Sequence, residues 1–429
     1  METDKRAVET QEKVQRFVLL AVEGDAAPIE AEKSLHELEE LLETAGAVSV
    51  GRIIQKLDSP HPKTYLGTGK IAEVKEKIAE TGADGVITDD ELTPVQLKAL
   101  TDQLGVKVVD RTLLILDIFS QRAVTKEGMM QVELAQLNYR LTRLTGLGTE
   151  LSRQGAAVGT HTRGAGETKL ELDRRHIRRR IDMLNRQLKD MEQQRGLLRS
   201  QRTENEIPVL ALVGYTNAGK STLFNRFTNA GVLEEDKLFA TLDTTTRKIL
   251  LPSGREALLT DTVGFIHKLP HQLVKAFRAT LEEVVYADIL LHVVDASDEK
   301  AQLNMTVTTK AMEDLGAGDK PVVTLLNKQD KAGASEMAVH VPYASEEILK
   351  ISAFSDEDRH AVLEAVDRIL DAQQMEISVL LPYSEGRLHD MIRRKGQILE
   401  EEFREDGIFL RVRTKKKYAS MVGAFQVQA

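Results

Sequence analysis

Glycine, lysine and serine stand at phosphate-binding spacing in residues Gly214–Ser221, GYTNAGKS. The stretch fits G-x-x-x-x-G-K-[ST], follows the apolar segment IPVLALVG and precedes STLFNRF, which begins like a helix. In that setting the loop amides and the helix N-terminus bind phosphate oxygens, Lys220 reaches the β- and γ-phosphates, and the Ser221 hydroxyl ligates Mg²⁺. A chance match on a glycine turn is the alternative, and the strand–loop–helix setting disfavours it.

A second motif, NKQD, ends the apolar segment KPVVTLLNK and supplies Asn327, Lys328 and Asp330. The Asp330 carboxylate can accept hydrogen bonds from both N1–H and the 2-amino group of guanine, whereas adenine offers no such pair of donors. A polar turn after a strand is the alternative. The position after the phosphate loop favours guanine, and ISA, with Ser352 and Ala353, follows at the next strand end.

Between these motifs lie DTVG, residues 261–264, and the threonine-rich stretch LFATLDTTTR. Asp261 is suited to hold Mg²⁺ through water, and the Gly264 amide is suited to sense the γ-phosphate. One threonine of the upstream stretch should coordinate Mg²⁺ when a triphosphate is bound. A β-edge or a flexible loop is the other interpretation of such a stretch, and its place before DTVG favours a nucleotide-sensing switch.

The composition excludes several classes of protein. The chain has 429 residues, no cysteine and a net charge of −9, so disulfide frameworks and cysteine metal sites are excluded and a uniformly basic nucleic-acid binder is disfavoured. The polar N-terminus resembles neither a signal nor a transit peptide, and no apolar run approaches the roughly 18 residues of a spanning helix. We therefore expect a cytoplasmic protein of two to four domains.

The pattern of apolar segments divides the chain into four predicted domains. Residues 1–126 alternate strands with amphipathic helices, which favours a parallel α/β sheet. Residues 127–203 carry apolar residues at steps of three and four, typical of an antiparallel helical hairpin. Residues 204–372 alternate again around the phosphate loop, and 373–429 form a small α+β domain. The predicted fold class is therefore α/β, with the hairpin and the α+β domain added.

The second hairpin helix is strongly basic. Residues 168–202 contain eleven Lys/Arg and five Asp/Glu, and RRHIRRR supplies Arg174, Arg175, Arg178, Arg179 and Arg180. These arginines are either a solvated face or a contact for RNA phosphates. The Gly/Thr-rich segment 146–168 before them predicts a long structureless loop, which is usually functional or disordered.

The order of the nucleotide motifs resembles that of the translation-factor-related GTPases, and further stretches resemble the HflX family of ribosome-associated GTPases. These are YLGTGK, DRTLLILDIFSQRA, QVELAQLNYRLTRL, GETKLELDRRHIRRRI and LFATLDTTTR, so the resemblance spans nearly the whole chain. It implies GTP hydrolysis, binding to the large ribosomal subunit and the 70S ribosome with rRNA contacts in residues 155–180, and disassembly or rescue of ribosomes under stress. A monomer is expected.

The resemblance also assigns roles to individual residues. The family's FATL identifies Thr241 as the switch threonine, and Phe265 stands where Ras-like enzymes carry a water-positioning glutamine, which implies slow turnover that a partner stimulates. Lys220, Thr241 and Gly264 are the expected catalytic residues, and Ser221, Thr241 and Asp261 the expected metal ligands. The full set expected at the nucleotide is Gly214, Tyr215, Thr216, Asn217, Ala218, Gly219, Lys220, Ser221, Thr222, Phe239, Ala240, Thr241, Leu242, Asp243, Asp261, Thr262, Val263, Gly264, Asn327, Lys328, Asp330, Ser352, Ala353 and Phe354.

The chain departs from the family in the loop Gly155–Thr168. The family's sequence is close to GGGIGTRGPGET, whereas this chain reads GAAVGTHTRGAGET, with His161 and Thr162 added and alanine in place of proline. Losing the proline should make the loop less constrained, which puts the strength of any RNA contact at this loop in question.

Two further ligands are suggested by short motifs. Asn217 could face a K⁺ ion between the phosphates, as in potassium-activated GTPases that lack the glutamine, or it could only stabilise the loop backbone. The favoured interpretation of LGTGK, residues 66–70, is a turn into a helix. A second phosphate site is the alternative, because the resemblance attributes ATP binding to this domain of the family.

A second function is compatible with these motifs. In place of a GTPase that splits or rescues ribosomes, the chain could be a nucleotide-gated RNA-binding module that assists subunit assembly with negligible turnover. Phe265 permits both interpretations, and GTPase assays with and without ribosomal subunits discriminate them. A coiled-coil scaffold would leave the nucleotide motifs unexplained.

Overall fold

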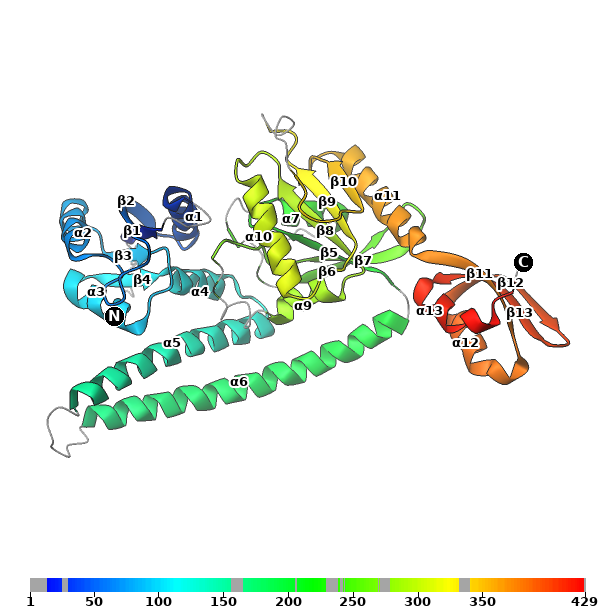
Figure 1. Ribbon diagram of the computed structural model, residues 1–429, viewed down its shortest axis with the longest axis horizontal. Helices are drawn as coiled ribbons and strands as arrows, with labels where there is room; N and C mark the ends of the chain where they lie inside the picture. Colours follow the sequence, from blue (N-terminus) through cyan, green and yellow to red (C-terminus); the bar gives the residue numbers. More distant parts are fainter. Residues whose placement is uncertain are drawn as a thin grey trace, which may run out of the picture. The chain divides into compact units, whose positions relative to one another are not determined.

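The computed structural model describes residues 14–24, 30–155, 165–204, 207–228, 238–239, 242, 244–268, 270, 278–331 and 340–427 (Figure 1). By contact the chain forms two compact units. Unit 1 comprises residues 1–191, 235–243 and 266–280, and unit 2 comprises 192–234, 244–265 and 281–429. Parallel sheets covered by helices occur in both units, which confirms the predicted α/β class.

The N-terminal sheet of unit 1 is fully parallel, with strand order β2-β1-β3-β4. The ends of helix α3 follow from local sequence signals: Thr93 caps it in a capping box, Pro94 begins it and Gly105 ends it in the left-handed conformation. The elements are β1 Arg16–Glu23, α1 Ala31–Thr44, β2 Val48–Lys56, α2 Thr68–Thr81, β3 Gly85–Thr88, α3 Pro94–Leu104, β4 Lys107–Asp110 and α4 Arg111–Arg122.

The predicted helical hairpin consists of α5, Lys126–Gly155, and α6, Ala165–Glu204. Leu134 and Leu184 are buried in its seam, with Ile181 and Leu188 packed against them, as the apolar spacing predicts. The prediction of a structureless loop over 146–168 is wrong for residues 146–155, which continue α5, and for 165–168, which begin α6, while residues 156–164 lie outside the described residues. Two glycines in a helix cost about 1 kcal/mol each, but Leu151 continues the seven-residue spacing from Leu144 and favours continuation.

Unit 2 contains a six-stranded sheet of order β10-β9-β8-β5-β7-β6, parallel except for β6, which pairs with β7 as an antiparallel hairpin. Its strands are β5 Val209–Gly214, β6 Thr245–Leu250, β7 Glu256–Asp261, β8 Ile289–Asp295, β9 Val322–Asn327 and β10 Glu347–Lys350. Its helices are α7 Lys220–Thr228, α9 Arg278–Tyr286, α10 Ala301–Asp314 and α11 Asp356–Ala372. The sheet's central strands β5, β8 and β9 are buried along most of their length, which suits a sheet covered on both faces.

The C-terminal part of unit 2 is the predicted α+β fold. Its antiparallel sheet has the order β11-β13-β12, and Ile392 of α12 is fully buried against Val379 and Leu410. The elements are β11 Gln374–Leu381, α12 Gly386–Lys395, β12 Gly396–Arg404, β13 Gly407–Lys415 and α13 Lys416–Met421. Among the described residues, no helix is long and apolar enough to cross a membrane.

Candidate phosphate- and base-binding site

The loop between β5 and α7 depends on glycine at both ends. Gly214 has a φ of 152°, and a Cβ there would lie 2.2 Å from the carbonyl oxygen of Val293. Gly219 has a φ of 99°, and a Cβ there would lie 2.3 Å from Nδ2 of Asn327. Both positions therefore exclude a side chain on steric and on conformational grounds, and the loop backbone can approach a ligand closely.

Lys220 begins α7 and its ammonium group is directed back over the loop. Nζ donates to the carbonyl oxygen of Tyr215 at 2.6 Å, and the residue is only 6% exposed. Burial lowers the pKa of Lys220 to about 8; Asp261 opposes this shift and Lys328 adds to it. A desolvated ammonium beside loop amides and a helix N-terminus is suited to bind phosphate oxygens.

Two predicted metal ligands lie together at the end of β7. The Ser221 hydroxyl donates to Oδ2 of Asp261 at 2.9 Å, and Asp261 is fully buried. Hydroxyl and carboxylate oxygens are the ligands that Mg²⁺ prefers, so this pair fits the metal. Gly264 is close by, because a Cβ there would lie 2.9 Å from both Nζ of Lys220 and Cα of Thr216.

Asn327 and Lys328 brace the phosphate loop from the end of β9. Asn327 donates through Nδ2 to the carbonyl of Ala218 at 2.9 Å and accepts through Oδ1 from the Ala353 amide at 3.0 Å. Lys328 donates to the carbonyl of Asn217 at 2.8 Å. The NKQD motif is thus hydrogen-bonded directly to the phosphate loop, and the ISA motif is joined to the loop through Asn327.

Asp330 lies at the predicted base-reading position. Its Oδ1 accepts from the Ser352 hydroxyl at 2.7 Å, and the Ser352 amide donates to Asp358 at 2.8 Å. Phe354 is 63% exposed, with the Arg226 guanidinium 5.4 Å from its ring centroid. A carboxylate with one oxygen already oriented by serine is arranged to accept from a planar base edge.

The remaining predicted residues have different environments. Tyr215, Thr216 and Ala218 are buried in the loop and Thr222 is half-buried in α7, while Val263 is buried after β7. The Thr262 hydroxyl donates to the carbonyl of Leu212 in β5 at 2.6 Å, so it contributes a hydrogen bond to the sheet. Phe239 and Leu242 belong to unit 1 and are buried there, and Phe239 makes an edge-on ring contact with Phe119 of the same unit. Ala240, Thr241 and Asp243 lie outside the described residues.

Sequence reasoning missed two carboxylates that support the site. Asp295, at the end of β8, forms an ion pair with Lys328 at 2.7 Å, and Asp358, in the first turn of α11, holds the Ser352 amide. Asp295 follows a buried strand in the same way as Asp261 does, and that position was the available signal.

The LGTGK motif has the geometry of a turn into a helix. Gly67 precedes α2, and its amide donates to Oε1 of Gln55 at 2.9 Å. Lys70 pairs with Glu73 at 2.8 Å. The favoured interpretation, a turn into a helix, is the one the structure contains, and ATP binding there stays a prediction.

The arginines of α6 divide into two groups. Arg174 donates to the carbonyl of Leu144 at 2.6 Å, and Arg180 pairs with Glu133 at 2.6 Å, so both have partners within the hairpin. Arg175, Arg178 and Arg179 are exposed. These three are the members of the basic segment best placed for an external anion.

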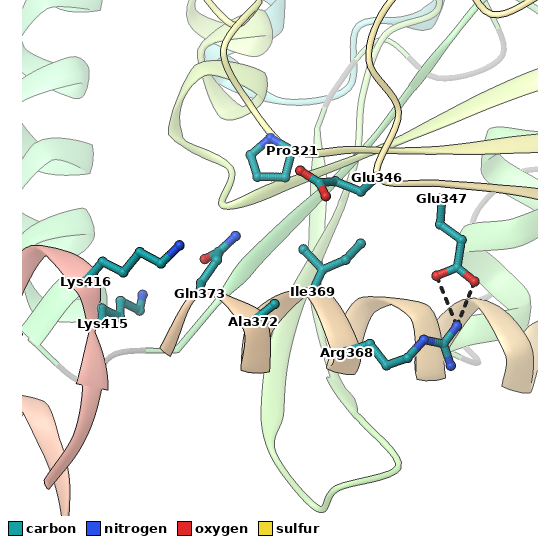
Figure 2. A pocket seen from close by; sticks show the side chains of 9 residues that line it. All are labelled: Pro321, Glu346, Glu347, Arg368, Ile369, Ala372, Gln373, Lys415 and Lys416. Atoms are coloured by element: carbon teal, nitrogen blue, oxygen red, sulfur yellow. Dashed lines mark hydrogen bonds and ion pairs between the residues drawn. The ribbon is translucent and has the colours of Figure 1, made fainter. Parts of the chain in front are cut away.

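A cavity of about 620 Å³ lies elsewhere in unit 2, between α11 and the C-terminal sheet (Figure 2). It is lined by none of the predicted site residues, and its charged lining includes Glu347, which pairs with Arg368 at 2.7 Å, and Lys415, which lies 3.8 Å from Asp288. We assign no ligand to this cavity.

The chain is similar to known proteins over most of its length. Three family profiles match: "GTP-binding GTPase N-terminal" at residues 32–120, "GTP-binding GTPase Middle Region" at 122–202 and "50S ribosome-binding GTPase" at 209–328. A crystal structure of a GTP-binding protein from Sulfolobus solfataricus in complex with GDP is 24% identical, covering 82% of this chain and 98% of that one, with a TM-score of 0.41.

Relatives named GTPase HflX are similar over nearly the full length. The protein of Lacrimispora saccharolytica is 50% identical over 94% of both chains. The protein of Escherichia coli K12 is 41% identical over 89% of both chains. The chain therefore belongs to the HflX family of GTPases, and it hydrolyses GTP.

Proposed function

We propose that this GTPase binds the large ribosomal subunit and the 70S ribosome and, in the GTP-bound form, dissociates or rescues stalled ribosomes under stress. The observation that carries the proposal is the match of residues 209–328 to a family described as ribosome-binding GTPases, together with an exposed basic hairpin in the same chain. GTP hydrolysis then times release of the protein from the subunit.

Phosphate binding is assigned to the loop and to Lys220. Loop amides from Gly214 to Gly219 surround the phosphates, and the buried ammonium neutralises charge on the β- and γ-phosphates. Asp330 accepts from the guanine edge, with Ser352 orienting it, and Asn327 keeps the base-reading motif in register with the loop. Ala353 and Phe354 border the base.

Metal binding is assigned to Ser221, Asp261 and Thr241. When bound there, Mg²⁺ supplies positive charge for the phosphoryl transfer. Ser221 and Asp261 already lie within hydrogen-bond distance of each other, and Thr241 joins them when triphosphate is present. Thr241→Ala should spare GDP affinity and weaken GTP-dependent ribosome effects. An equal loss of affinity for both nucleotides would move the metal role to Thr244, Thr245 or Thr246.

Catalysis proceeds without a glutamine after DTVG. Phe265 is buried, and its backbone bonds both to Gly214 and to Thr216, so this residue braces the loop and cannot polarise water. We therefore expect slow intrinsic hydrolysis that the ribosome stimulates. K⁺ near Asn217 is an additional proposal. Asn217 has a φ of 59°, which asparagine tolerates and which also suits a purely loop-stabilising role. Equal hydrolysis rates in K⁺ and Na⁺ with subunits present would exclude the ion.

Ribosomal RNA contact is assigned to residues 155–180, with Arg175, Arg178 and Arg179 as the exposed cations. Such contacts make affinity fall steeply with salt. Replacing these three arginines with glutamine should weaken co-sedimentation with large subunits and flatten its salt dependence. Arg174 and Arg180 have partners in the hairpin, so they are poor choices for this test.

Several coarser expectations complete the proposal. We propose a cytoplasmic monomer with domains at 1–126, 127–203, 204–372 and 373–429, and ATP as a second nucleotide of the N-terminal domain. Equilibrium sedimentation tests the monomer, limited proteolysis tests the boundaries, and ATP titration of the Lys70→Ala variant tests the second nucleotide.

The second candidate function is subunit assembly by a nucleotide-gated RNA-binding module, and the observation that favours it is Phe265 in place of glutamine. Steady-state GTP hydrolysis with and without purified large subunits separates the two functions. The proposed function requires strong stimulation by the subunits. Negligible turnover in their presence would leave the assembly module.

A further inference from the structure

Two consecutive residues at the start of α4 contact different parts of unit 1. Asp110 is fully buried and caps α4, accepting from the Leu113 amide at 2.9 Å and from the Leu92 amide at 3.2 Å. Arg111, the first residue of α4, is 1% exposed. Both side chains are therefore fixed by the same buried helix terminus.

Asp110 binds the hairpin. The Tyr139 hydroxyl donates to its Oδ1 at 2.9 Å, and Arg143 donates to its Oδ2 at 2.5 Å. The Arg143 guanidinium also lies 3.2 Å from the Tyr139 ring centroid, so the two side chains of α5 form one unit around a buried carboxylate. Displacement of this stretch of α5 would act directly on the first turn of α4.

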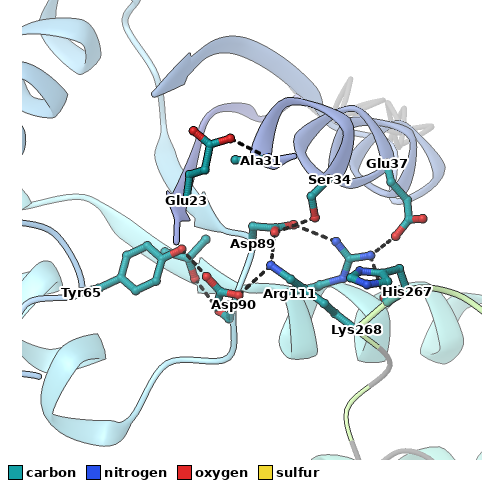
Figure 3. Close-up of polar contacts among 11 residues, drawn as sticks. Glu23, Ala31, Ser34, Glu37, Tyr65, Asp89, Asp90, Arg111, His267 and Lys268 are labelled. Carbon is teal, nitrogen blue, oxygen red and sulfur yellow. Dashed lines mark hydrogen bonds and ion pairs between the residues drawn. The ribbon is translucent and has the colours of Figure 1, made fainter. Parts of the chain in front are cut away.

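Arg111 binds the segment that follows DTVG. Its guanidinium donates to the carbonyl of His267 at 3.0 Å and pairs with Asp89 at 2.8 Å and with Glu37 (Figure 3). Lys268 pairs in turn with Asp89 at 2.5 Å and with Asp90 at 2.7 Å. Residues 266–280 accordingly group with unit 1 by contact, although they continue directly from the DTVG motif.

The backbone of Lys268 is held in a strained conformation by the contacts of its neighbours. Its φ is 52°, in the left-handed region that lysine rarely adopts, and such strain persists only where surrounding contacts maintain it. The ion pairs to Asp89 and Asp90 and the bond from Arg111 to the preceding carbonyl are those contacts.

We propose that Arg111 and Lys268 are positioning residues for GTP hydrolysis, and that Asp110 links them to the hairpin through Tyr139 and Arg143. The inference rests on the proposed function in one respect, since it takes the ribosome as the ligand that acts on the hairpin. Binding of RNA to the hairpin shifts α5, α5 shifts the start of α4, and α4 shifts the segment after DTVG. Stimulation of hydrolysis by the ribosome therefore depends on these contacts.

The first test requires no ribosome. Tyr139→Phe removes one hydroxyl and keeps the ring, and hydrogen exchange is measured for the amides of residues 265–268. Hydrogen exchange of these amides should accelerate by about fivefold. Tyr383→Phe is the matched control, because it removes a hydroxyl bonded to the Arg404 carbonyl in the C-terminal sheet. Unchanged exchange at 265–268 in Tyr139→Phe overturns the proposal whatever the ribosome does.

The second test compares GTP turnover with and without large subunits, together with co-sedimentation. Lys268→Met should keep co-sedimentation and lower the stimulated-to-basal ratio by about fivefold or more, whereas Lys268→Arg should retain most of it. Lys77→Met is the control, because Lys77 pairs with Glu80 at 2.9 Å on the surface of α2. A normal ratio in Lys268→Met would overturn the proposal.

The double variant Tyr139→Phe/Lys268→Met gives the sharpest outcome. Since both residues act along one chain of contacts, its ratio should equal that of Lys268→Met alone, and additive losses would contradict the link. Failure of the proposed function has a different signature: the unaltered protein would neither co-sediment with subunits nor be stimulated by them, while the exchange experiment would still decide the link.

Discussion

The N-terminal sheet and the six-stranded sheet each have a lysine beside the carboxyl ends of their parallel strands. The two lysines, Lys268 from the segment after DTVG and Lys220 from the phosphate loop, have opposite environments. Lys220, after β5, is desolvated, and burial lowers its pKa to about 8. Lys268 lies beside Asp89 and Asp90 after β3; burial alone would lower its pKa, but the two carboxylates outweigh burial and raise it. One sheet edge therefore keeps its positive charge for an anionic ligand, and the other pairs it within the protein.

The shared architecture explains where the charged residues of both sheets lie, but it does not explain the sign of their charge. Parallel strands gather polar residues at one edge, which explains why both sheets have a charged site there. The residues of the loop that follows the strand determine the sign of the charge at that edge. After β5 the chain presents a glycine-rich turn and a helix N-terminus, whereas after β3 it presents Asp89 and Asp90.

The largest expected effect comes from removing the buried lysine of the phosphate loop. Lys220→Met should lower GTP hydrolysis by roughly 10²–10³-fold, because charge on the transferred phosphoryl group loses its neutralising cation. It should also raise the free energy of unfolding of the nucleotide-free protein by about 1 kcal/mol, because a desolvated charge is removed. Single-turnover hydrolysis and urea unfolding measure the two effects. A less stable variant would contradict the contrast between the two lysines.

The N-terminal site should respond to substitution in the opposite direction. Asp89→Asn leaves the buried Arg111 without one of its two carboxylate partners and Lys268 without one of its own, and should lower the free energy of unfolding of unit 1 by about 3 kcal/mol. Asp371→Asn is the control, because it breaks an exposed ion pair with Arg255 and should change stability by less than about 1 kcal/mol. Equal effects in urea unfolding would show that the Asp89 cluster is not tightly coupled.

Base reading should give a smaller change. Asp330→Asn replaces an acceptor pair by one acceptor and one donor and should weaken GTP binding by roughly 1–3 kcal/mol relative to ATP. Competition titrations with GTP and ATP measure the preference, and Asp298→Asn, in the turn after β8, serves as control. An unaltered preference for GTP in Asp330→Asn would show that another group reads the base.

The smallest expected effect is the change in the free energy of unfolding with pH. Burial lowers the pKa of His267 to about 4 and that of His292 to about 3, both below the ordinary value of 6.5. These histidines therefore bind more protons in the unfolded chain between pH 6.5 and about 4, so their contribution to stability should fall as pH is lowered across this window and be constant above it.

Substitution at these histidines tests that slope. His292→Asn should flatten it by up to roughly 1 kcal/mol per pH unit in unit 2, and His267→Asn should flatten it less in unit 1, because His267 is only half-buried. Urea unfolding at pH 7, 6 and 5 gives the slopes. A slope that neither substitution changes would assign the dependence to other groups.

Sequence patterns predicted the elements that depend on local signals. The phosphate loop, the caps of α3 and the seam around Leu184 all follow from short-range spacing, and the structure contains each of them. The helical continuation of α5 to Gly155 was missed, because two glycines outweighed a seven-residue apolar spacing in the prediction.

Contacts between distant segments could not be predicted. Nothing near Lys268 in the sequence indicates Asp89, which lies 179 positions away, and Arg111 reaches His267 across 156 positions. Asp89 and Arg111 directly follow the strands β3 and β4, but their partners depend on tertiary packing. The site's local chemistry was therefore readable from sequence, whereas its connection to the hairpin was not.

The central claim is that the GTP-bound protein acts on ribosomes, and sucrose-gradient sedimentation of 70S ribosomes tests it most directly. Ribosomes are incubated with the protein and GTP, GDP or a non-hydrolysable GTP analogue. The account predicts separated subunits, with the protein on the large one, for GTP and the analogue and intact 70S ribosomes for GDP. Intact 70S ribosomes without bound protein under all three conditions would contradict it.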